Sequence, residues 1–378
     1  MSSIQRGLAA FAGSMYQLAR PLVFRQSAQS AHEKVLRLLA ACDTVPGLSA
    51  ALTLVHRAAF ERHEVTVGGV RLPAPFILAA GMVKGKGFAD EAVAVAAVQD
   101  GENIIPGWRS FPALVGAVEF GSFTRWPRVG NAGTVMWRDA TTCSTQNYVG
   151  LKNPGAKAAA LFLAVRQAAL PARYGINVAV SPGVSDAAQE RDEAAFAVNC
   201  FVEKQLRPAW FTLNVSCPNT EDDPSSHQTE QRTRALCAAV RDVLKPTAIP
   251  LWVKVSPTLA DEQYAVLMSV FAETGVRAVV ATNTLPQPHP TQPMLAAGVG
   301  GGRLHEKALR TARVLAAARD RLGCPVDVVG CGGVQDAETI RAFQAIGINA
   351  MQYWSALIYR GPLVAALMMT EMEHTHGN

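Results

Sequence analysis

Residues 210–220 read Trp-Phe-Thr-Leu-Asn-Val-Ser-Cys-Pro-Asn-Thr, an apolar strand followed by a polar, Pro-stiffened turn. Two carboxamides, Asn214 and Asn219, flank the thiol of Cys217. Each carboxamide offers both a donor and an acceptor, so the pair can hold a planar ring that carries imide groups. A thiol forms its anion far more easily than a hydroxyl does, which suits a general base. A turn with one buried Cys is the alternative, but the flanking amides, the strand and the polar loop 221–229 favour chemistry.

The strand at 210–216 is one of eight apolar runs that alternate with helical segments after residue 64. Eight strands that alternate with helices predict a parallel (β/α)8 TIM barrel. A doubly wound open sheet is the alternative, but it would scatter the polar residues that follow the strands. The strand runs are 76–80, 117–124, 176–181, 210–216, 251–256, 278–284, 326–332 and 350–355, and the helical segments include 192–205, 231–243, 261–274, 304–322 and 336–345.

Polar or reactive residues stand in or just beyond the last part of these runs. A barrel collects the carboxyl ends of its strands on one face, and its active site forms there. We therefore expect these residues to converge at one mouth of the barrel. They are Lys84, Asn177, Cys217, Lys254, Asn283, Gly332 and Ser355.

The chain divides into a helical head, residues 1–64, and the barrel, residues 65–378. Residues 1–60 contain six Lys or Arg and two acidic side chains, so they carry +4 of the net charge of +5. Basic amphipathic helices of this kind lie on anionic membrane surfaces, and packing on the barrel is the equal alternative. Segment 101–112, rich in large apolar side chains, is interpreted as an insertion.

Composition narrows the class of protein further. A chain of 378 residues with 49% hydrophobic content is long enough for one barrel with an appendage. Seven Cys without CxxC or Cys/His spacing indicate a reducing compartment, with no disulfide frame and no metal site. Basic and aromatic residues are not interleaved, so nucleic-acid binding is not expected. With no apolar run of bilayer length and no signal peptide, we expect a cytoplasmic protein.

Two glycines after the seventh strand run predict a phosphate site. Gly332 and Gly333 let backbone N–H groups approach a phosphate, and Asp336 can cap the helix that follows. The eighth run ends at 351–355, Met-Gln-Tyr-Trp-Ser. Because loops after strands seven and eight commonly hold phosphate in such barrels, we expect either a flavin phosphate or a sugar phosphate here.

Lys254 stands inside the apolar run 251–256. A buried Lys is costly unless an anion meets it. A reduced flavin carries negative charge at its pyrimidine end, so a flavin would meet this requirement. A small, planar, anionic substrate rich in amides would suit the lysine and the amides near the other strand ends, which are Lys84, Asn147, Asn214, Asn219 and Asn283.

From residue 16 to residue 362 the chain resembles the dihydroorotate dehydrogenases. The head, with residues 16–25 and the triplet Ala31-His32-Glu33, resembles the N-terminal extension of the membrane-associated, quinone-reducing class 2 enzymes. In the barrel the matching stretches are Ala79-Ala80-Gly81 with Lys84, 147–153, 214–220, 253–255, 281–284 and Gly332-Gly333.

The resemblance implies an FMN-containing barrel that oxidises dihydroorotate to orotate in pyrimidine biosynthesis and passes electrons to a membrane quinone. Cys217 would take a proton from C5 of dihydroorotate while hydride leaves C6 for flavin N5. His32 would lie near the quinone, and residues 1–60 would contact the inner membrane peripherally. The substrate would be held by Lys84, Asn147, Gly150, Leu151, Asn214, Asn219, Asn283 and Thr284. FMN would be held by Ala80, Gly81, Asn177, Asn214, Lys254, Thr282, Gly302, Gly332, Gly333, Trp354 and Ser355.

Several positions depart from the class 2 pattern. Cys217 replaces the usual Ser base and is the choice of the soluble class 1 enzymes. Val135 is aligned with an Arg that class 2 enzymes carry near their quinone, and Trp354 replaces the customary Tyr. Residues 301–303 read Gly-Gly-Arg instead of Ser-Gly-Arg, and residues 177–180 read Asn-Val-Ala-Val instead of Asn-Ile-Gly-Lys.

Three alternatives therefore stay open. A paralogous flavin oxidoreductase would act on another small ring compound and use a different acceptor. A non-redox barrel lyase or isomerase would use the phosphate site for a sugar phosphate. A flavin-binding scaffold would bind the cofactor without turnover. Yellow protein would exclude the lyase or isomerase, and bleaching by dihydroorotate would separate the remaining hypotheses.

Overall fold

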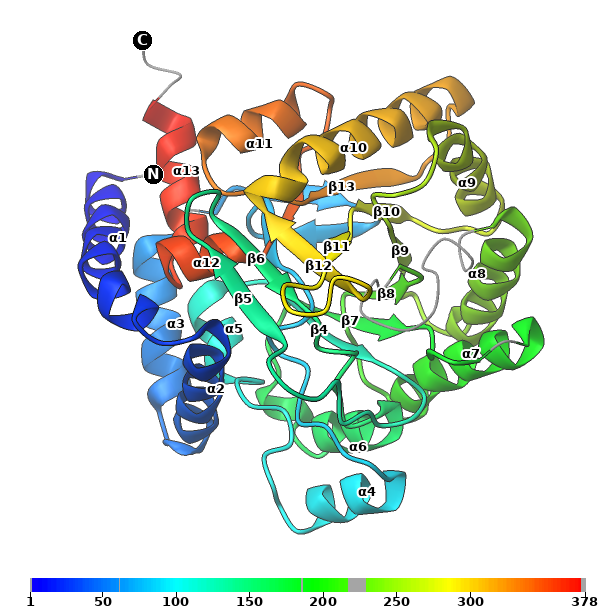
Figure 1. Ribbon diagram of the computed structural model, residues 1–378, viewed down its shortest axis with the longest axis horizontal. Coiled ribbons are helices and arrows are strands. Elements are labelled where there is room, and N and C mark those ends of the chain that lie inside the picture. Colours follow the sequence, from blue (N-terminus) through cyan, green and yellow to red (C-terminus); the bar gives the residue numbers. More distant parts are fainter. Residues whose placement is uncertain (1, 61, 185, 217–228, 375–378) are drawn as a thin grey trace.

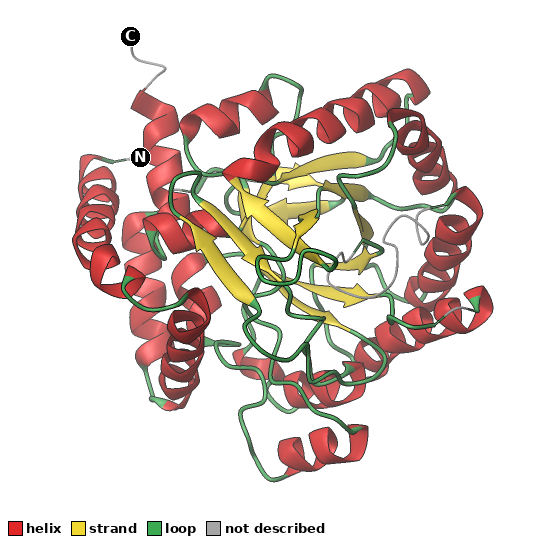
Figure 2. Ribbon diagram, viewed as in Figure 1, coloured by secondary structure: helices red, strands yellow, loops and turns green. Residues whose placement is uncertain are grey.

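The eight apolar runs form a closed parallel barrel (Figures 1 and 2). The computed structural model describes residues 2–60, 62–184, 186–216 and 229–374. Around the barrel the strand order is β10-β13-β14-β3-β4-β7-β8-β9, which confirms the TIM-barrel prediction and excludes the doubly wound sheet. The strands are β3 (Phe76–Leu78), β4 (Val118–Phe123), β7 (Tyr174–Ala179), β8 (Trp210–Asn214), β9 (Leu251–Val255), β10 (Ala278–Ala281), β13 (Asp327–Cys331) and β14 (Met351–Tyr353).

The barrel strands are largely apolar on both faces because they lie between the barrel interior and a ring of helices. Each helix presents an apolar stripe to the strands. In α8 the buried residues Leu236, Val240 and Leu244 recur every four positions and form such a stripe. The helices around the barrel are α4 (Glu91–Gln99), α6 (Ala156–Ala164), α7 (Ala187–Glu203), α8 (Glu230–Leu244), α9 (Asp261–Glu273), α10 (Gly302–Leu322), α11 (Ala337–Gln344), α12 (Ser355–Arg360) and α13 (Val364–His374), with a short 3-10 turn, η1 (Gln167–Ala169).

A second sheet, not predicted from the sequence, lies beside the carboxyl ends of the barrel strands (Figure 1). It is antiparallel, in the order β11-β12-β6-β5. Its strands are β5 (Met136–Asp139), β6 (Ser144–Asn147), β11 (Leu285–Pro288) and β12 (Ala296–Gly301). Strands β5, β6 and β11 are mostly half-buried, so they lack the apolar runs that reveal the barrel strands.

A hairpin of β1 (Val65–Val67) and β2 (Val70–Leu72) covers the opposite end of the barrel. It packs on Trp210 and Trp252, whose rings stack with centroids 4.7 Å apart near the start of their strands. The Trp252 indole N–H donates to the Gly68 carbonyl at 3.2 Å. A Cβ at Gly68 would lie 2.3 Å from that nitrogen, so the turn requires glycine. This end of the barrel is therefore closed by packed side chains.

The predicted helical head consists of α1 (Ser3–Phe24), α2 (Ala28–Thr44) and α3 (Leu48–Ala59), which lie beside α5 (Ser110–Val115), α12 and α13 (Figure 1). The buried Asp43 carboxylate accepts from the Gly107 N–H at 2.7 Å and from the Ser110 N–H at 2.9 Å. The segment 101–112, interpreted from the sequence as an insertion, is therefore the surface on which the head docks.

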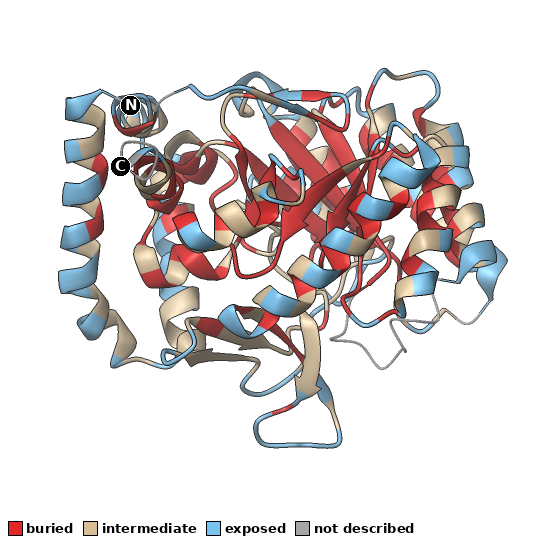
Figure 3. Ribbon diagram, turned by 90° about the horizontal axis from the view of Figure 1, so that it is seen from above, coloured by how far each residue is buried: buried red, intermediate tan, exposed pale blue. Residues whose placement is uncertain are grey.

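The alternative in which the head packs on the barrel is confirmed, and its membrane binding stays a prediction. Its inner faces pack on the barrel, while its outer faces are exposed (Figure 3). Large apolar side chains lie on those outer faces, with Ile4 79%, Leu18 73% and Leu54 65% exposed. No single described helix has the length and apolar character to cross a bilayer, and α2 with α3 qualifies only as a pair bent by 110°.

Candidate active site

One cavity of ≈ 490 Å³ extends from the helical head to the carboxyl ends of the barrel strands. Helices α1, α2, α3 and α5 wall one end, and barrel strands with β5 and β6 wall the other. Cys217 and Asn219 lie outside the described residues. The predicted site residues on the wall are His32, Ala80, Gly81, Lys84, Asn147, Leu151, Asn177, Asn214, Lys254, Thr282, Asn283, Thr284, Gly332, Gly333, Trp354 and Ser355.

Two predicted site residues, Gly150 and Gly302, are not on the cavity wall. Gly150 has a φ of +69°, and its carbonyl accepts from Arg128 Nε at 3.1 Å. Gly302 begins α10, and a Cβ there would lie 2.2 Å from the Thr142 carbonyl oxygen. Both glycines therefore shape the backbone next to the cavity, and their roles in binding substrate and FMN stay predictions.

Lys254 is buried inside the barrel, as its apolar strand predicts, with only 6% of its surface exposed. Its ammonium donates to Gln352 Oε1 at 3.0 Å and lies 3.5 Å from Cys331 Sγ. Burial raises the pKa of the Cys331 thiol, and the Lys254 charge opposes that rise. Lys254 therefore brings a positive charge to the wall of a desolvated cavity.

Asn177 lies on β7 and is completely buried. Its Nδ2 donates to Glu119 Oε1 at 2.7 Å. Its Oδ1 has no hydrogen-bond partner among the described residues. A buried amide oxygen left unpaired costs free energy, so a ligand that brings an N–H to this part of the wall would be stabilised.

A second group of amides lies where β8 and β10 end. Asn283 Nδ2 donates to the Ser216 carbonyl at 2.8 Å, and the Thr284 N–H donates to Asn283 Oδ1 at 2.8 Å. Asn214 Oδ1 accepts from the Ser216 N–H at 3.2 Å and from Ser216 Oγ at 3.0 Å. These bonds fix the two amides and the residue that precedes Cys217 in the chain, so the segment enters the predicted catalytic turn from a defined position.

The glycine pair after β13 has the conformation expected of a close-approach loop. Gly332 has a φ of +130° and Gly333 a φ of +68°. A Cβ at Gly333 would lie 2.5 Å from His305 Cβ, so a larger residue does not fit. Ser355 Oγ lies 2.7 Å from Thr145 Oγ1, and both residues line the cavity. Sequence reasoning missed Thr145 because it missed strand β6.

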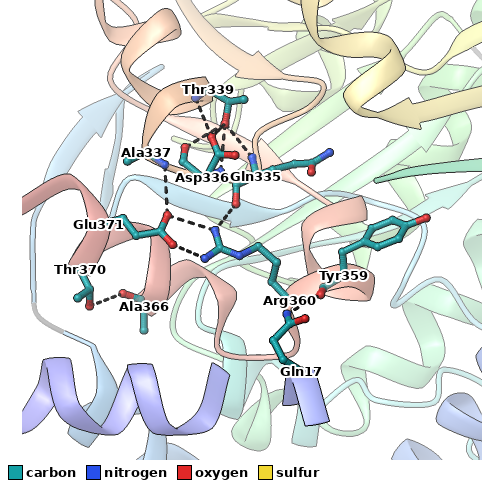
Figure 4. A network of polar contacts seen from close by, with 10 residues as sticks. All are labelled: Gln17, Gln335, Asp336, Ala337, Thr339, Tyr359, Arg360, Ala366, Thr370 and Glu371. Atoms are coloured by element: carbon teal, nitrogen blue, oxygen red, sulfur yellow. Dashed lines mark hydrogen bonds and ion pairs between the residues drawn. The ribbon is translucent and has the colours of Figure 1, made fainter. Parts of the chain in front are cut away.

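A polar network supports this loop from behind (Figure 4). Arg360 donates to the Gln335 carbonyl at 2.5 Å and forms an ion pair with Glu371 on α13. Asp336 caps α11, as predicted, by accepting from the Thr339 N–H at 2.9 Å. The loop between β13 and α11 is thus held from both of its sides.

The head is tied to the same region through α12. The Tyr16 hydroxyl on α1 donates to the Ile358 carbonyl at 2.7 Å. Gln17 and Arg20 donate to the Tyr359 carbonyl at 3.0 Å and 3.1 Å. Because α12 begins at Ser355, the head and the glycine loop share one short helix as a support.

His32 lies at the head end of the cavity, on α2. Burial, together with the positive charges of Lys84 and Lys152, lowers its pKa to about 4. His32 is therefore neutral at physiological pH. Much of the wall around this end is apolar and comes from Val23, Val35, Leu38, Leu39, Leu52, Phe111 and Leu114.

Val135 and Arg138 differ in their position relative to the cavity. Val135 is not on the cavity wall, and its N–H donates to Gln29 Oε1 at 2.9 Å. Arg138, three residues later, does line the cavity and stacks its guanidinium 4.2 Å from the centroid of Phe24. The head end of the cavity thus has an arginine after all.

Two polar parts of the cavity wall at its barrel end would suit FMN. A hydrogen-bond donor and an unpaired acceptor, Lys254 and Asn177, suit the pyrimidine edge of a flavin. The glycine pair and Ser355 suit a phosphate, because the glycines leave backbone room and Ser355 begins a helix. These two parts of the wall line one cavity, so a single elongated cofactor can reach both.

Comparisons with known proteins agree with the fold. Among solved structures, the complex of DHODH with ferulenol from Eimeria tenella superposes with a TM-score of 0.74 at 19% identity, covering 94% of this chain and 96% of that one. The ligand-free DHODH from the same organism gives a TM-score of 0.68 at 18% identity, covering 88% of this chain and 96% of that chain.

Comparisons of sequence find relatives with higher identity than these solved structures. A curated protein of Streptomyces griseus, named dihydroorotate dehydrogenase (quinone), is 31% identical over 93% of this chain and 91% of its own length. A protein of the same name from Chloroflexus aurantiacus is 30% identical over 91% of this chain and 92% of its own length. The family described as dihydroorotate dehydrogenase matches residues 62–375. This chain therefore belongs to the dihydroorotate dehydrogenase family.

Proposed function

We propose that this protein oxidises dihydroorotate to orotate with bound FMN and passes the electrons to a membrane quinone. The observation that carries the proposal is the single cavity that joins the amide cluster, the Lys254 and Asn177 wall and the apolar chamber around His32. Such a cavity would let a reduced cofactor meet its substrate at one end and an apolar acceptor at the other. Its relatives named dihydroorotate dehydrogenase (quinone) support the same activity.

The amide cluster supports a substrate that is planar and rich in amides. Asn147, Asn214 and Asn283 lie on the wall with Lys84, which would bind the carboxylate of dihydroorotate. Carboxamides that offer both a donor and an acceptor match the alternating N–H and C=O groups of the ring. This arrangement would present one face of the ring to the turn that follows Ser216.

Cys217 would act as the general base at C5, which is acidified by the adjacent carbonyl. A general base of this kind is worth about 10²–10⁴ in rate. When bound, FMN supplies the hydride acceptor for the bond that breaks at C6. Asn214 holds Ser216, the residue before Cys217, through two hydrogen bonds of 3.2 Å and 3.0 Å, and this would keep the base in reach.

The head supports an apolar acceptor that arrives from a membrane. The chamber wall is largely aliphatic and aromatic, and His32 within it is uncharged. Exposed apolar side chains such as Phe11, Leu22 and Leu38 stand on helices that also carry most of the net positive charge. Such a surface binds anionic bilayers peripherally, so we place the protein on the cytoplasmic side of the inner membrane.

An anaerobic experiment tests the proposal. Dihydroorotate is added to the purified yellow protein, and the visible absorbance of the flavin is followed; a ubiquinone or menaquinone analogue is added next. We expect bleaching in the first step and recovery of the colour in the second. Colour that does not change with dihydroorotate would rule out the proposed substrate, and bleaching without recovery would rule out the quinone.

A paralogous flavin oxidoreductase is the second candidate. Trp354 favours it, because its indole lies on the cavity wall and Nε1 is 3.5 Å from the position of a Cβ on Gly81. A side chain of that size would reshape the space above the cofactor. In that case another small ring compound, and not dihydroorotate, would bleach the flavin.

A further inference from the structure

A buried carboxylate lies behind the cofactor wall. Glu119, in the middle of β4, is 0% exposed. Its Oε2 accepts from Trp210 Nε1 at 2.8 Å, from Thr212 Oγ1 at 2.6 Å and from Gln352 Nε2 at 3.1 Å. Its Oε1 accepts from Asn177 Nδ2 at 2.7 Å. Glu119 is not on the cavity wall, so it acts on any ligand only through these neighbours.

The Glu119 carboxylate determines which atom of the Asn177 amide, Oδ1 or Nδ2, is available to a ligand. A carboxylate oxygen only accepts hydrogen bonds, so the amide must turn its Nδ2 toward Glu119. The opposite end, Oδ1, is then left for the ligand, and it has no partner among the described residues. With Glu119 in place, Asn177 is therefore an acceptor for the cavity.

The same carboxylate orients Lys254 through a second amide. Gln352 turns its Nε2 toward Glu119, so its Oε1 faces the other way and accepts from the Lys254 ammonium at 3.0 Å. Reversal of the Gln352 amide would place its N–H groups against the Lys254 ammonium and its oxygen against the Glu119 carboxylate, and both contacts are unfavourable. Lys254 is thereby held as a donor on the same wall.

We propose that Glu119 is a positioning residue that sets the hydrogen-bond polarity of the cofactor wall, with Asn177 as acceptor and Lys254 as donor. An acceptor beside a donor matches an imide edge, in which an N–H stands next to a carbonyl, and the pyrimidine ring of a flavin carries that edge. The inference rests on the proposed function only in that the cofactor is a flavin. It does not depend on dihydroorotate or on the quinone.

The substitution Glu119→Gln tests this polarity with almost no change of shape. The new amide nitrogen has two possible places. At the Oε2 position it would face three donors, so it must take the Oε1 position, which faces Asn177 alone. Asn177 then has to turn its oxygen toward the new amide and its Nδ2 toward the ligand. The wall would present a donor where the native protein presents an acceptor.

A second substitution should reverse the effect. In the double variant Glu119→Gln and Asn177→Asp, the new carboxylate can accept from the new amide with one oxygen and serve the ligand with the other. The buried negative charge is conserved, because it moves from position 119 to position 177. A purely structural role of Glu119 predicts no such rescue, since the double variant differs from the native core at two positions instead of one.

The measurement is the dissociation constant of FMN for the full chain after removal of its flavin, compared with that of 3-methyl-FMN, which lacks the imide N–H. We expect Glu119→Gln to weaken FMN binding about 10- to 100-fold. The reason is that Asn177 Nδ2 would face the imide N–H of FMN, so two donors would stand where the native protein forms a buried hydrogen bond. Binding of 3-methyl-FMN should change by less than about threefold, and the double variant should recover most of the FMN affinity. Glu203→Gln, on the exposed end of α7, is the matched control and should leave both constants unchanged.

Two results would overturn the inference: equal weakening of both flavins in Glu119→Gln, or a double variant that binds FMN no better than the single variant. The thermal midpoint of each flavin-free variant shows whether it is folded. If Glu119→Gln does not fold, the double variant is compared with Asn177→Asp, in which two carboxylates face each other. The double variant should then bind FMN more tightly than Asn177→Asp, and equal or weaker binding would overturn the inference. Failure of dihydroorotate to bleach the native flavin would reject the proposed function and leave these binding results intact.

Discussion

The two ends of the cavity are built in different ways. At the barrel end the polar side chains on the wall are fixed by partners behind them: Asn283 is held by the Ser216 carbonyl at 2.8 Å, and Asn177 by Glu119 at 2.7 Å. At the head end much of the wall consists of aliphatic and aromatic side chains on α1, α2, α3 and α5. The barrel end presents hydrogen-bonding groups in fixed directions, and the head end offers apolar volume.

This difference indicates which parts of the site tolerate amino-acid substitutions. A hydrogen-bonding wall works only if each donor and acceptor keeps its direction, because a reversed amide costs the bond and leaves a group unpaired. An apolar chamber depends on its volume and accepts different side chains of similar size. We therefore expect point changes at the barrel end to stop individual chemical steps, and changes at the head end to alter acceptor use alone.

The largest effect should follow Cys217→Ala. Removal of the base should slow flavin reduction by dihydroorotate about 10²- to 10⁴-fold while FMN stays bound. Anaerobic stopped-flow absorbance of the flavin measures this rate. Cys324→Ala, off the cavity wall, is the matched control and should be neutral. Near-native reduction in Cys217→Ala would remove the thiol from the mechanism.

His32 gives the next effect, on stability. Burial lowers its pKa to about 4, so between pH 6.5 and pH 4 the unfolded chain takes up a proton that the folded chain does not. The free energy of unfolding therefore falls as the pH falls through this window, by about 3 kcal/mol. His32→Gln should lose this part of the pH dependence in urea unfolding. His56, whose pKa burial also lowers, is unchanged in both proteins. Parallel pH curves for the two would contradict a half-buried His32 that stays neutral in the folded protein.

Lys254→Met should lower the reduction potential of the flavin. The ammonium would stabilise the negative charge of the reduced cofactor, and a charge-assisted hydrogen bond is worth about 1.5–3 kcal/mol. For a two-electron couple this corresponds to about 30–60 mV. A redox titration against a reference dye measures it, with the exposed Lys245→Met as control. An unchanged potential would place the ammonium away from the flavin.

The barrel could be predicted from the sequence because a parallel strand in a barrel is apolar on both faces. All eight runs proved to be barrel strands, and the helices between them lie within a few residues of their predicted bounds. The outer sheet could not be predicted in this way. Strands such as β5 (Met136–Asp139) are half-buried and polar, and they depend on partners that are distant in the chain.

Site residues could be predicted where they belong to a motif or where a charged residue stands inside an apolar strand. The other site residues were missed. Lys254 was found because a charge inside a strand needs a partner, and the same signal in run 117–124 identifies Glu119, which sequence reasoning did not use. Thr145 and Arg138 gave no signal, since they reach the cavity only through the fold of the outer sheet. Asp43 likewise looks like any acidic helix residue until the segment that it caps is in place.

The smallest predicted effect tests the head end of the cavity. Ala31 lines the chamber from α2, so Ala31→Trp should fill part of it and slow flavin reoxidation by a quinone about tenfold. Reduction by dihydroorotate should not change, and neither should reoxidation by a small hydrophilic acceptor that does not need the chamber. Ala50→Trp, on the exposed face of α3, is the matched control. Slowing of both half-reactions would mean that the two ends are not independent, and slowing of neither would move the acceptor out of the chamber.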